Sequence, residues 1–349
     1  MSSPLSRLTP NRSSIDEQLA SPPKLLVVID TEEEFDWNAP FARENNSVAA
    51  MDDIGKAQAL FDEFGLRPTY VIDYPVASQE RGYTQLREFA SSGRAQIGAH
   101  LHPWVSPPHE ETVNSVNSYP GNLPAELEQA KLHQLLQTIE ANFGERPTIY
   151  KAGRYGLGGN TAGILEAEGL EIDLSLCSAF DLGADGGPDY SESDARPFWF
   201  GPSGKLLGLP TTGAFLGVAG TSSPGLYRFA TRPALRPLHL GGILSRLGIV
   251  ERLLLSPEGH AFEDLKRLTQ GLIRRGIRTF SLSFHSPSMR PGCTPYVRNE
   301  RELHEFLGTC RRYFEFFLED LNGTLSTPNE VLAELRASAS SAPDTSCAS

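Results

Sequence analysis

Long apolar runs are absent from this chain of 349 residues. A transmembrane helix needs about 20 consecutive apolar residues, so we expect none here. Residues 1–23 also lack the continuous apolar segment of a secretory signal peptide, which predicts a cytoplasmic protein. Cysteine is scarce, and its four positions form neither a CxxC pair nor zinc-finger spacing: Cys177, Cys293, Cys310 and Cys347. A disulfide framework is therefore excluded, and we expect reduced thiols.

Positive charge is also in short supply. The chain has 31 lysines and arginines against 43 aspartates and glutamates, a formal net charge of −12. This balance disfavours nucleic acid and anionic membranes as partners. No GxSxG turn precedes a helix either, which argues against a Ser–His–Asp hydrolase.

What is present is the pattern of one α/β domain. With 39% hydrophobic residues the chain can bury a sizeable core, and its length suits a single barrel. Low-complexity ends predict disordered tails at 1–23 and 337–349 around a barrel domain at 24–336. Strand-like runs occur at 25–29, 69–72, 95–99, 148–152, 171–176, 205–210 and 279–284, and helical periodicity occurs at 54–64, 83–90, 124–143, 161–168, 261–275 and 299–318.

This alternation predicts parallel strands joined by right-handed crossovers. About seven such units favour a barrel, with an open doubly wound sheet as the alternative. Several polar residues follow the predicted strands, where barrels carry their active sites, although strands also end in polar residues for purely structural reasons: Asp30, Asp73, His100, Arg154, Asp173, Thr211 and His285. The long loops 180–202 and 213–237 are expected to shape a substrate cleft.

Two strands end in paired metal-ligand residues. Asp30 and Glu32 follow one apolar strand, and His100 and His102 end another, each pair at spacing i, i+2. Residues two apart on an extended backbone point to the same face. Imidazole and carboxylate together suit a divalent metal with hydrolytic chemistry, with one acid as ligand and the other as general base. The alternative is that the acidic run at 32–34 is a solvated charge cluster.

Three further candidates complete the predicted site. Arg154 lies in a glycine-rich turn and could orient the base carboxylate through a bidentate pair, although the turn also reads as an ordinary helix start. His285 could protonate a leaving group, or cap a structural element. Trp104 is either a sugar-stacking platform or a buried ring, and Tyr155 joins it as a candidate substrate-binding residue.

The order of these motifs over residues 24–320 resembles the polysaccharide deacetylase family, also called the chitooligosaccharide deacetylase homology group or carbohydrate esterase family four. The resemblance implies a distorted (β/α)7 barrel that uses a divalent metal to remove N- or O-acetyl groups from sugars. It implies Asp30 as base, with Glu32, His100 and His102 as metal ligands. It also implies that Arg154 orients the base, that His285 is the acid, and that Asp173 supports His285.

Two departures from the family pattern point to a divergent subgroup, of the kind associated with gene clusters for cell-surface polysaccharide or lipopolysaccharide. Thr31 separates the two acids, which are usually adjacent aspartates, and Trp104 stands where the second histidine usually lies. Both changes still give i, i+2 pairs on one face of a strand.

The sequence therefore predicts a metal-dependent hydrolase that removes an acyl group from an amino sugar or from a polysaccharide or lipopolysaccharide precursor. Zinc is the expected metal, with manganese, magnesium, cobalt or nickel as alternatives. Two other functions stay open: a non-catalytic carbohydrate-binding barrel, and a metal-dependent amidohydrolase acting on a non-sugar C–N bond.

Overall fold

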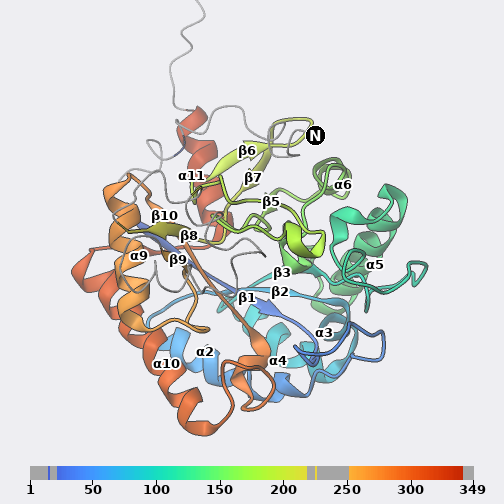
Figure 1. Ribbon diagram of the computed structural model, residues 1–349, viewed down its shortest axis with the longest axis horizontal. Coiled ribbons are helices and arrows are strands. Elements are labelled where there is room, and N and C mark those ends of the chain that lie inside the picture. Colours follow the sequence, from blue (N-terminus) through green and yellow to red (C-terminus); the bar gives the residue numbers. More distant parts are fainter. Residues whose placement is uncertain (1–14, 16–21, 218–224, 226–250, 341–349) are drawn as a thin grey trace, which may run out of the picture.

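The computed structural model describes residue 15, residues 22–217, residue 225 and residues 251–340 (Figure 1). Most of the two expected tails and much of loop 213–237 lie outside these residues. The last helix, α11, covers Pro328–Ser340. The domain thus continues in helical form through residues 337–340, which the sequence analysis had assigned to the C-terminal tail.

Seven parallel strands curl around a common axis (Figure 1). In spatial order they are β10 (Thr279–His285), β1 (Lys24–Thr31), β2 (Thr69–Ile72), β3 (Gln96–Leu101), β4 (Ile149–Ala152), β5 (Ile172–Asp173) and β7 (Leu206–Gly208). The gap between β7 and β10 is bridged by a few backbone hydrogen bonds: Thr212 N donates to Ser281 O at 3.3 Å, and Ser283 N donates to Leu255 O at 3.1 Å. This loose closure confirms the distorted (β/α)7 barrel and excludes the open sheet.

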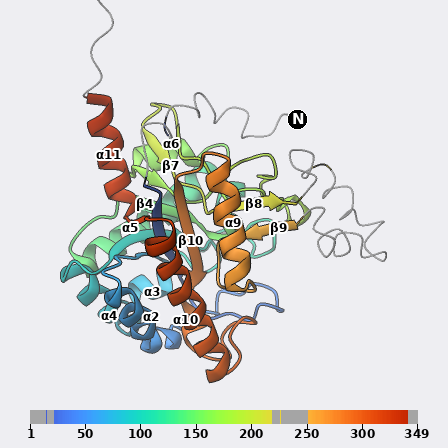
Figure 2. The same ribbon diagram turned by 90° about the vertical axis from the view of Figure 1, so that its left-hand side faces the viewer.

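The six helices expected from periodicity are present: α2 (Gly55–Glu63), α4 (Glu80–Ser91), α5 (Ala125–Phe143), α6 (Thr161–Ala167), α9 (Phe262–Arg274) and α10 (Glu300–Glu315). Figure 2 shows α9 and α10 alongside β10. In α5, an apolar stripe that includes Leu132, Leu136 and Ile139 packs on the barrel. The helix ends at Gly144, whose φ of 85° favours a residue without a side chain.

The sequence analysis missed several short elements. They are helix α3 (Tyr74–Ser78), strand β6 (Phe198–Phe200), the antiparallel pair of strands β8 (Gly213–Leu216) and β9 (Glu251–Leu254), strand β11 (Thr324–Leu325), the turns η2 (Ala49–Asp53), η3 (Pro120–Asn122), η4 (Gly153–Tyr155), η5 (Gly183–Asp185) and η8 (Ser286–Met289), and the π-helical turn η9 (Phe316–Asp320). Strand β6 and turn η5 lie inside loop 180–202, which was expected to be irregular.

Alternation along each strand divides the core in two. Leu26 and Val28 belong to an inner cluster that fills the barrel, whereas Leu25 and Val27 face the surrounding helices. Helix α11 contributes to the inner cluster, and β11 pairs with the start of β1. The amino-terminal end of the barrel is therefore plugged by apolar side chains, which leaves the carboxyl-terminal end for polar ones.

Gly98 shows how closely the interior is packed. A Cβ atom there would lie 2.9 Å from Val71 Cγ1 and 3.1 Å from Ile149 Cγ2, so β3 has room for no side chain at this level. The next inward positions are His100, in β3, and His102, directly after its last residue. The strand therefore changes from tight packing to ligand-type side chains as it reaches the open end.

The remaining sequence expectations concern thiols and membranes. Cys177, Cys293 and Cys310 are free thiols, as expected, and Cys347 lies outside the described residues. None of the described helices has both the length and the apolar character that a membrane span requires.

Candidate active site

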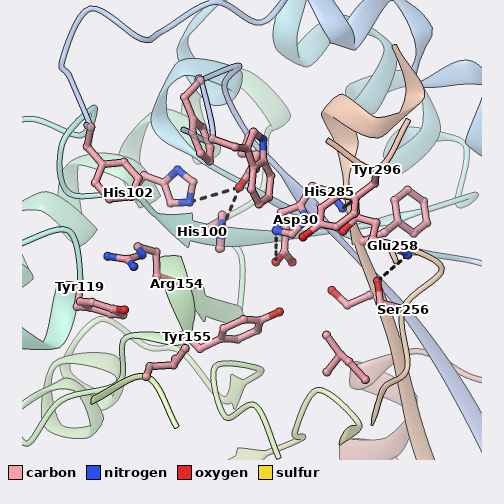
Figure 3. Close-up of a pocket in the computed structure, with 18 of the residues that line it drawn as sticks. Asp30, His100, His102, Tyr119, Arg154, Tyr155, Ser256, Glu258, His285 and Tyr296 are labelled. Carbon is pink, nitrogen blue, oxygen red and sulfur yellow. Dashed lines mark hydrogen bonds and ion pairs between the residues drawn. The ribbon is translucent and has the colours of Figure 1, made fainter. Parts of the chain in front are cut away.

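The ends of β1, β3 and β10 deliver their polar side chains to one cavity of about 390 Å³ (Figure 3). Its walls include Asp30, Glu32, His100, His102 and His285. The sequence analysis selected these five residues because they lie at or just beyond the ends of predicted strands, four of them as pairs at spacing i, i+2. The structure brings them together at the carboxyl-terminal end of the barrel, where such folds place their chemistry.

Glu32, His100 and His102 form a cluster of metal-ligand type. Nε2 of His100 lies 3.8 Å and Nε2 of His102 lies 3.5 Å from Oε2 of Glu32. The ligand atoms of all three residues lie within 4.8 Å of one another, and all three side chains are buried. The two rings stand side by side, with centroids 4.6 Å apart, because the spacing i, i+2 puts them on one face of the strand.

The far side of each imidazole is fixed by a hydrogen bond. Nδ1 of His100 donates to the backbone carbonyl of Lys151 at 2.9 Å, and Nδ1 of His102 donates to Oε2 of Glu33 at 2.8 Å. Each Nε2 is then the nitrogen with a free lone pair. Burial lowers the pKa of His100 and lowers the pKa of His102 to about 4, so both rings are neutral, as metal ligation requires.

Glu32 shows whether this cluster suits a metal ion. Its Oε1 atom is buried and has no hydrogen-bond partner among the described residues. Burial raises the pKa of Glu32 to about 7, against the opposing effect of the charge on His285. An unsatisfied buried carboxylate oxygen is costly, and a bound cation would remove that cost. Two neutral nitrogens and this oxygen are a donor set that fits a divalent metal such as zinc.

A second group of ligand type consists of Glu33, Asp73 and His102. Its atoms already form hydrogen bonds with one another and with the backbone. Asp73 accepts hydrogen bonds from the backbone N–H groups of Glu33 and Val76, each at 2.8 Å. One oxygen of Glu33 accepts a hydrogen bond from His102. The other accepts a hydrogen bond from the indole N–H of Trp104 at 2.7 Å. We therefore assign this group to holding His102 and not to binding a metal.

Asp30 is paired with Lys151. Nζ of Lys151 donates to both carboxylate oxygens, at 2.6 and 2.8 Å, and to Oγ of Ser283 at 3.1 Å. Burial opposes ionisation of Asp30, but the charge of Lys151 outweighs it and lowers the pKa of the carboxyl group. Lys151 is completely buried. Asp30 is thus an ionised carboxylate beside the metal-type cluster.

The expected pairing of Arg154 with Asp30 is wrong. Lys151 faces the barrel interior two positions after Ile149 in β4, whereas Arg154 lies beyond the strand in η4, in a left-handed conformation with φ of 53°. That turn directs Arg154 towards another wall of the cavity. The lysine inside the strand therefore makes the contact that was predicted for the arginine after it.

His285 is held by Glu258. Nδ1 of His285 donates to Oε2 of Glu258 at 2.7 Å, and Nε2 points towards Oδ2 of Asp30 at 3.9 Å. Burial lowers the pKa of His285, but the carboxylates of Glu258 and Glu32 outweigh it and raise the pKa to about 10. The imidazole is therefore protonated at neutral pH and presents its Nε2–H to the cavity.

The expected support of His285 by Asp173 is also wrong. Asp173 alternates with the inward-facing Ile172 and Leu174, so its side chain lies on the outer face of β5. It accepts hydrogen bonds from the hydroxyl and the N–H of Ser175. Asp173 is a buried structural acid, and Glu258 has the role that was predicted for it.

The two predicted substrate-binding aromatics differ in exposure. Trp104 is only 1% exposed and is packed against His102 and Phe41, with ring centroids 4.2 and 4.4 Å away. It is a buried ring and offers no stacking face. Tyr155 lines the cavity, and its role in substrate binding stays a prediction. Trp37, which also lines the cavity, packs edge-on against His285, with ring centroids 5.1 Å apart, and contacts Tyr296, which is 39% exposed.

The hydrogen bond from His102 to Glu33 leads to a prediction about metal affinity. Glu33→Gln removes the negative charge behind His102 and is expected to weaken zinc binding about 10- to 100-fold. Titration with zinc against a competing chelator measures this. Trp104→Phe is the matched control, because it removes the indole donor but keeps the contact between Glu33 and His102, and it should cost much less. Equal affinities for Glu33→Gln and the unchanged protein would contradict the assignment.

Comparisons with known proteins support the fold. No protein-family model matches the sequence, and no curated protein matches it. Among solved structures, a protein designated a polysaccharide deacetylase from Mycobacterium smegmatis has a TM-score of 0.53 at 14% identity, with 95% of each chain covered. The Puue allantoinase has a TM-score of 0.53 at 17% identity, covering 97% of this chain and all of that one.

A third similar structure carries another name. The 4-alpha-glucanotransferase from Thermococcus litoralis has a TM-score of 0.50 at 11% identity, and the match covers 90% of this chain but only 40% of that one. The three names differ in activity, so the shared feature is the barrel. The chain has the fold of the polysaccharide deacetylases, as its motif order led us to expect.

Proposed function

We propose that this chain is a metal-dependent hydrolase that removes an acyl group from an amino sugar or a related carbohydrate. The observation that carries the proposal is the convergence of Glu32, His100 and His102, with both imidazoles fixed from behind and one buried oxygen of Glu32 unpaired. An ionised Asp30 and a protonated His285 lie next to each other beside that cluster, with Nε2 of His285 3.9 Å from Oδ2 of Asp30. A base and an acid beside a cation site are what metal-assisted hydrolysis needs.

Each side chain has its own role in the proposed reaction. Glu32, His100 and His102 would hold the metal, which would polarise an acyl carbonyl and lower the pKa of water. Asp30, kept ionised by Lys151, accepts a proton from the attacking water. His285, kept protonated by Glu258, donates a proton from Nε2 to the departing amine. The cavity of about 390 Å³ suits a substrate of monosaccharide size. Zinc as the metal and a cytoplasmic location remain predictions from the sequence.

Metal analysis and an acetate-release assay test the proposal. The purified full chain should contain stoichiometric metal, release acetate from one or more members of a panel of N- and O-acetylated sugars, and lose that activity to a chelator. Asp30→Asn is the control, because it should keep the metal but lose activity. Full activity of the metal-loaded Asp30→Asn protein would contradict the assigned base. Sugar binding without acetate release would point instead to the non-catalytic barrel.

A second candidate is an amidohydrolase acting on a non-sugar C–N bond. It is favoured by the allantoinase, whose TM-score equals that of the designated deacetylase. The same metal, base and acid would serve such a substrate. Simple amides and ureides placed in the same assay separate the two candidates, since turnover of these compounds without turnover of any sugar would select the second.

A further inference from the structure

Arg154 gives the cavity a fixed positive charge that the proposed chemistry does not use. It is the sole lysine or arginine among the described residues that line the cavity. Figure 3 shows it between His102 and Tyr119, on the side away from Asp30 and Glu258. The arginine therefore stands beside the metal-type cluster but apart from the acid and the base.

The guanidinium group is held rigidly at this position. Nη1 donates to Oγ of Ser118 at 2.6 Å and to the carbonyl of Ser115 at 3.2 Å. The group also lies over the ring of Tyr119, 4.1 Å from its centroid, and 5.1 Å from the centroid of Phe41. Aromatic walls exclude water and strengthen the interaction of a cation with an incoming anion.

The backbone conformation at Arg154 and Tyr155 also supports a functional role for Arg154. Arg154 and Tyr155 both have left-handed conformations, with φ of 53° and 59°, which are unfavourable for residues with a Cβ atom. Two consecutive conformations of this kind persist only where the surrounding structure imposes them, and they concentrate at binding and catalytic sites. Here they turn Arg154 into the cavity wall, so that Lys151 and not Arg154 pairs with Asp30.

Donor capacity remains for a ligand. An arginine has five N–H groups, and the contacts with Ser115, Ser118 and Asp185 use three of them. Nε and one N–H of Nη2 have no acceptor among the described residues. Within the described part of the chain, the one carboxylate paired with Arg154 is Asp185, at 3.2 Å, and its side chain is 60% exposed. An exposed pair of this kind is weak and can yield to a substrate anion.

We propose that Arg154 binds an anionic group of the substrate, a carboxylate or a phosphate, so that the site prefers acylated sugars with an acidic substituent. The proposal rests on the proposed function, because it names the class of substrate for the same site. Arginine suits this role because its planar donors match both anions in bidentate geometry.

A matched panel of sugars tests the proposal. N-acetylglucosamine is the neutral probe, its 6-phosphate carries a phosphate, and N-acetylglucosaminuronic acid carries a carboxylate. With the full-length protein, at least one acidic sugar should have a higher kcat/KM than the neutral sugar. Arg154→Gln should lower the ratio of acidic to neutral kcat/KM about 10- to 100-fold. Whichever acidic sugar responds identifies the anion.

Two further variants separate charge recognition from a structural role. Ser118→Ala removes the hydrogen bond between Arg154 and Ser118 but keeps the arginine. It should therefore change the ratio of acidic to neutral kcat/KM far less than Arg154→Gln. Asp185→Asn removes the competing carboxylate and should raise the ratio. An equal loss on all three sugars in Arg154→Gln would show a general positioning role and would overturn the proposal.

Calorimetric titration of the three sugars gives a readout that does not depend on turnover. Tighter binding of an acidic sugar, lost in Arg154→Gln, would support the proposal even if no sugar were hydrolysed, a result that would refute the proposed function alone. Hydrolysis of the neutral sugar with no preference for either acid, and no change of the ratio in Arg154→Gln, would overturn the proposal and leave the hydrolase intact.

Discussion

Replacing Lys151 with methionine is expected to remove most of the activity and to lower the free energy of unfolding by about 3–5 kcal/mol. Lys151 is completely buried and donates to both oxygens of Asp30. Methionine fills similar space but leaves Asp30 as a buried carboxylate without its main counter-charge. Such a group either destabilises the fold or takes up a proton, and a protonated Asp30 cannot accept one from water.

A double-mutant cycle makes this expectation specific. Asp30→Asn removes the charge that needs Lys151, so the combination of Asp30→Asn with Lys151→Met should be more stable than Lys151→Met alone, although both are inactive. Urea unfolding of the four proteins gives the coupling free energy, and metal content shows whether the ligand cluster survives. Additive effects of the two changes, or full activity of Lys151→Met, would refute the assigned pairing.

The strand alternation explains why much of the site could be predicted. Asp30 and Glu32 continue the inward positions of Leu26 and Val28, and His100 continues that of Gly98. A period of two, read from an apolar strand into its polar end, is enough to select side chains that share one face. The barrel followed from the same reading, because alternating strands and helices leave few other topologies.

The alternation along the strands also indicates the directions of two side chains that the sequence analysis did not use. Lys151 stands two positions after the inward Ile149, so its inward direction was readable, but the resemblance drew attention to Arg154 beyond the strand end. Asp173 sits out of phase with the inward Ile172 and Leu174, which places its side chain on the outer face. In both cases phase within the strand decided the contact, and nearness to the strand end did not.

Other parts of the site left no signal in the sequence. Glu258 follows β9 in a loop, and its contact with His285 depends on how a distant segment folds back over β10. Glu33 looked like a solvated neighbour of Glu32, yet it is completely buried beneath His102 and Trp104. Loop geometry and long-range burial have no period, so these contacts required the structure.

Replacing His285 with glutamine is expected to lower kcat for an N-acetyl sugar by about 10²- to 10⁴-fold, the usual contribution of a general acid. His285 is protonated at neutral pH because of Glu258, and its Nε2 faces the cavity beside Asp30. A departing amine needs that proton, since an amide anion is a very poor leaving group. The metal-type cluster does not include His285, so metal content should be unchanged.

The leaving group distinguishes an acid from a structural residue. An activated ester such as 4-nitrophenyl acetate expels a stable phenolate and needs no proton, so its hydrolysis should fall far less in His285→Gln than hydrolysis of the amide. Glu258→Gln should show the same selectivity in weaker form, because it removes the charge that keeps His285 protonated. Ser288→Ala serves as the control, since it removes another contact of Glu258 and leaves its bond with His285. Equal losses on the ester and the amide would mean that His285 shapes the cavity without donating a proton.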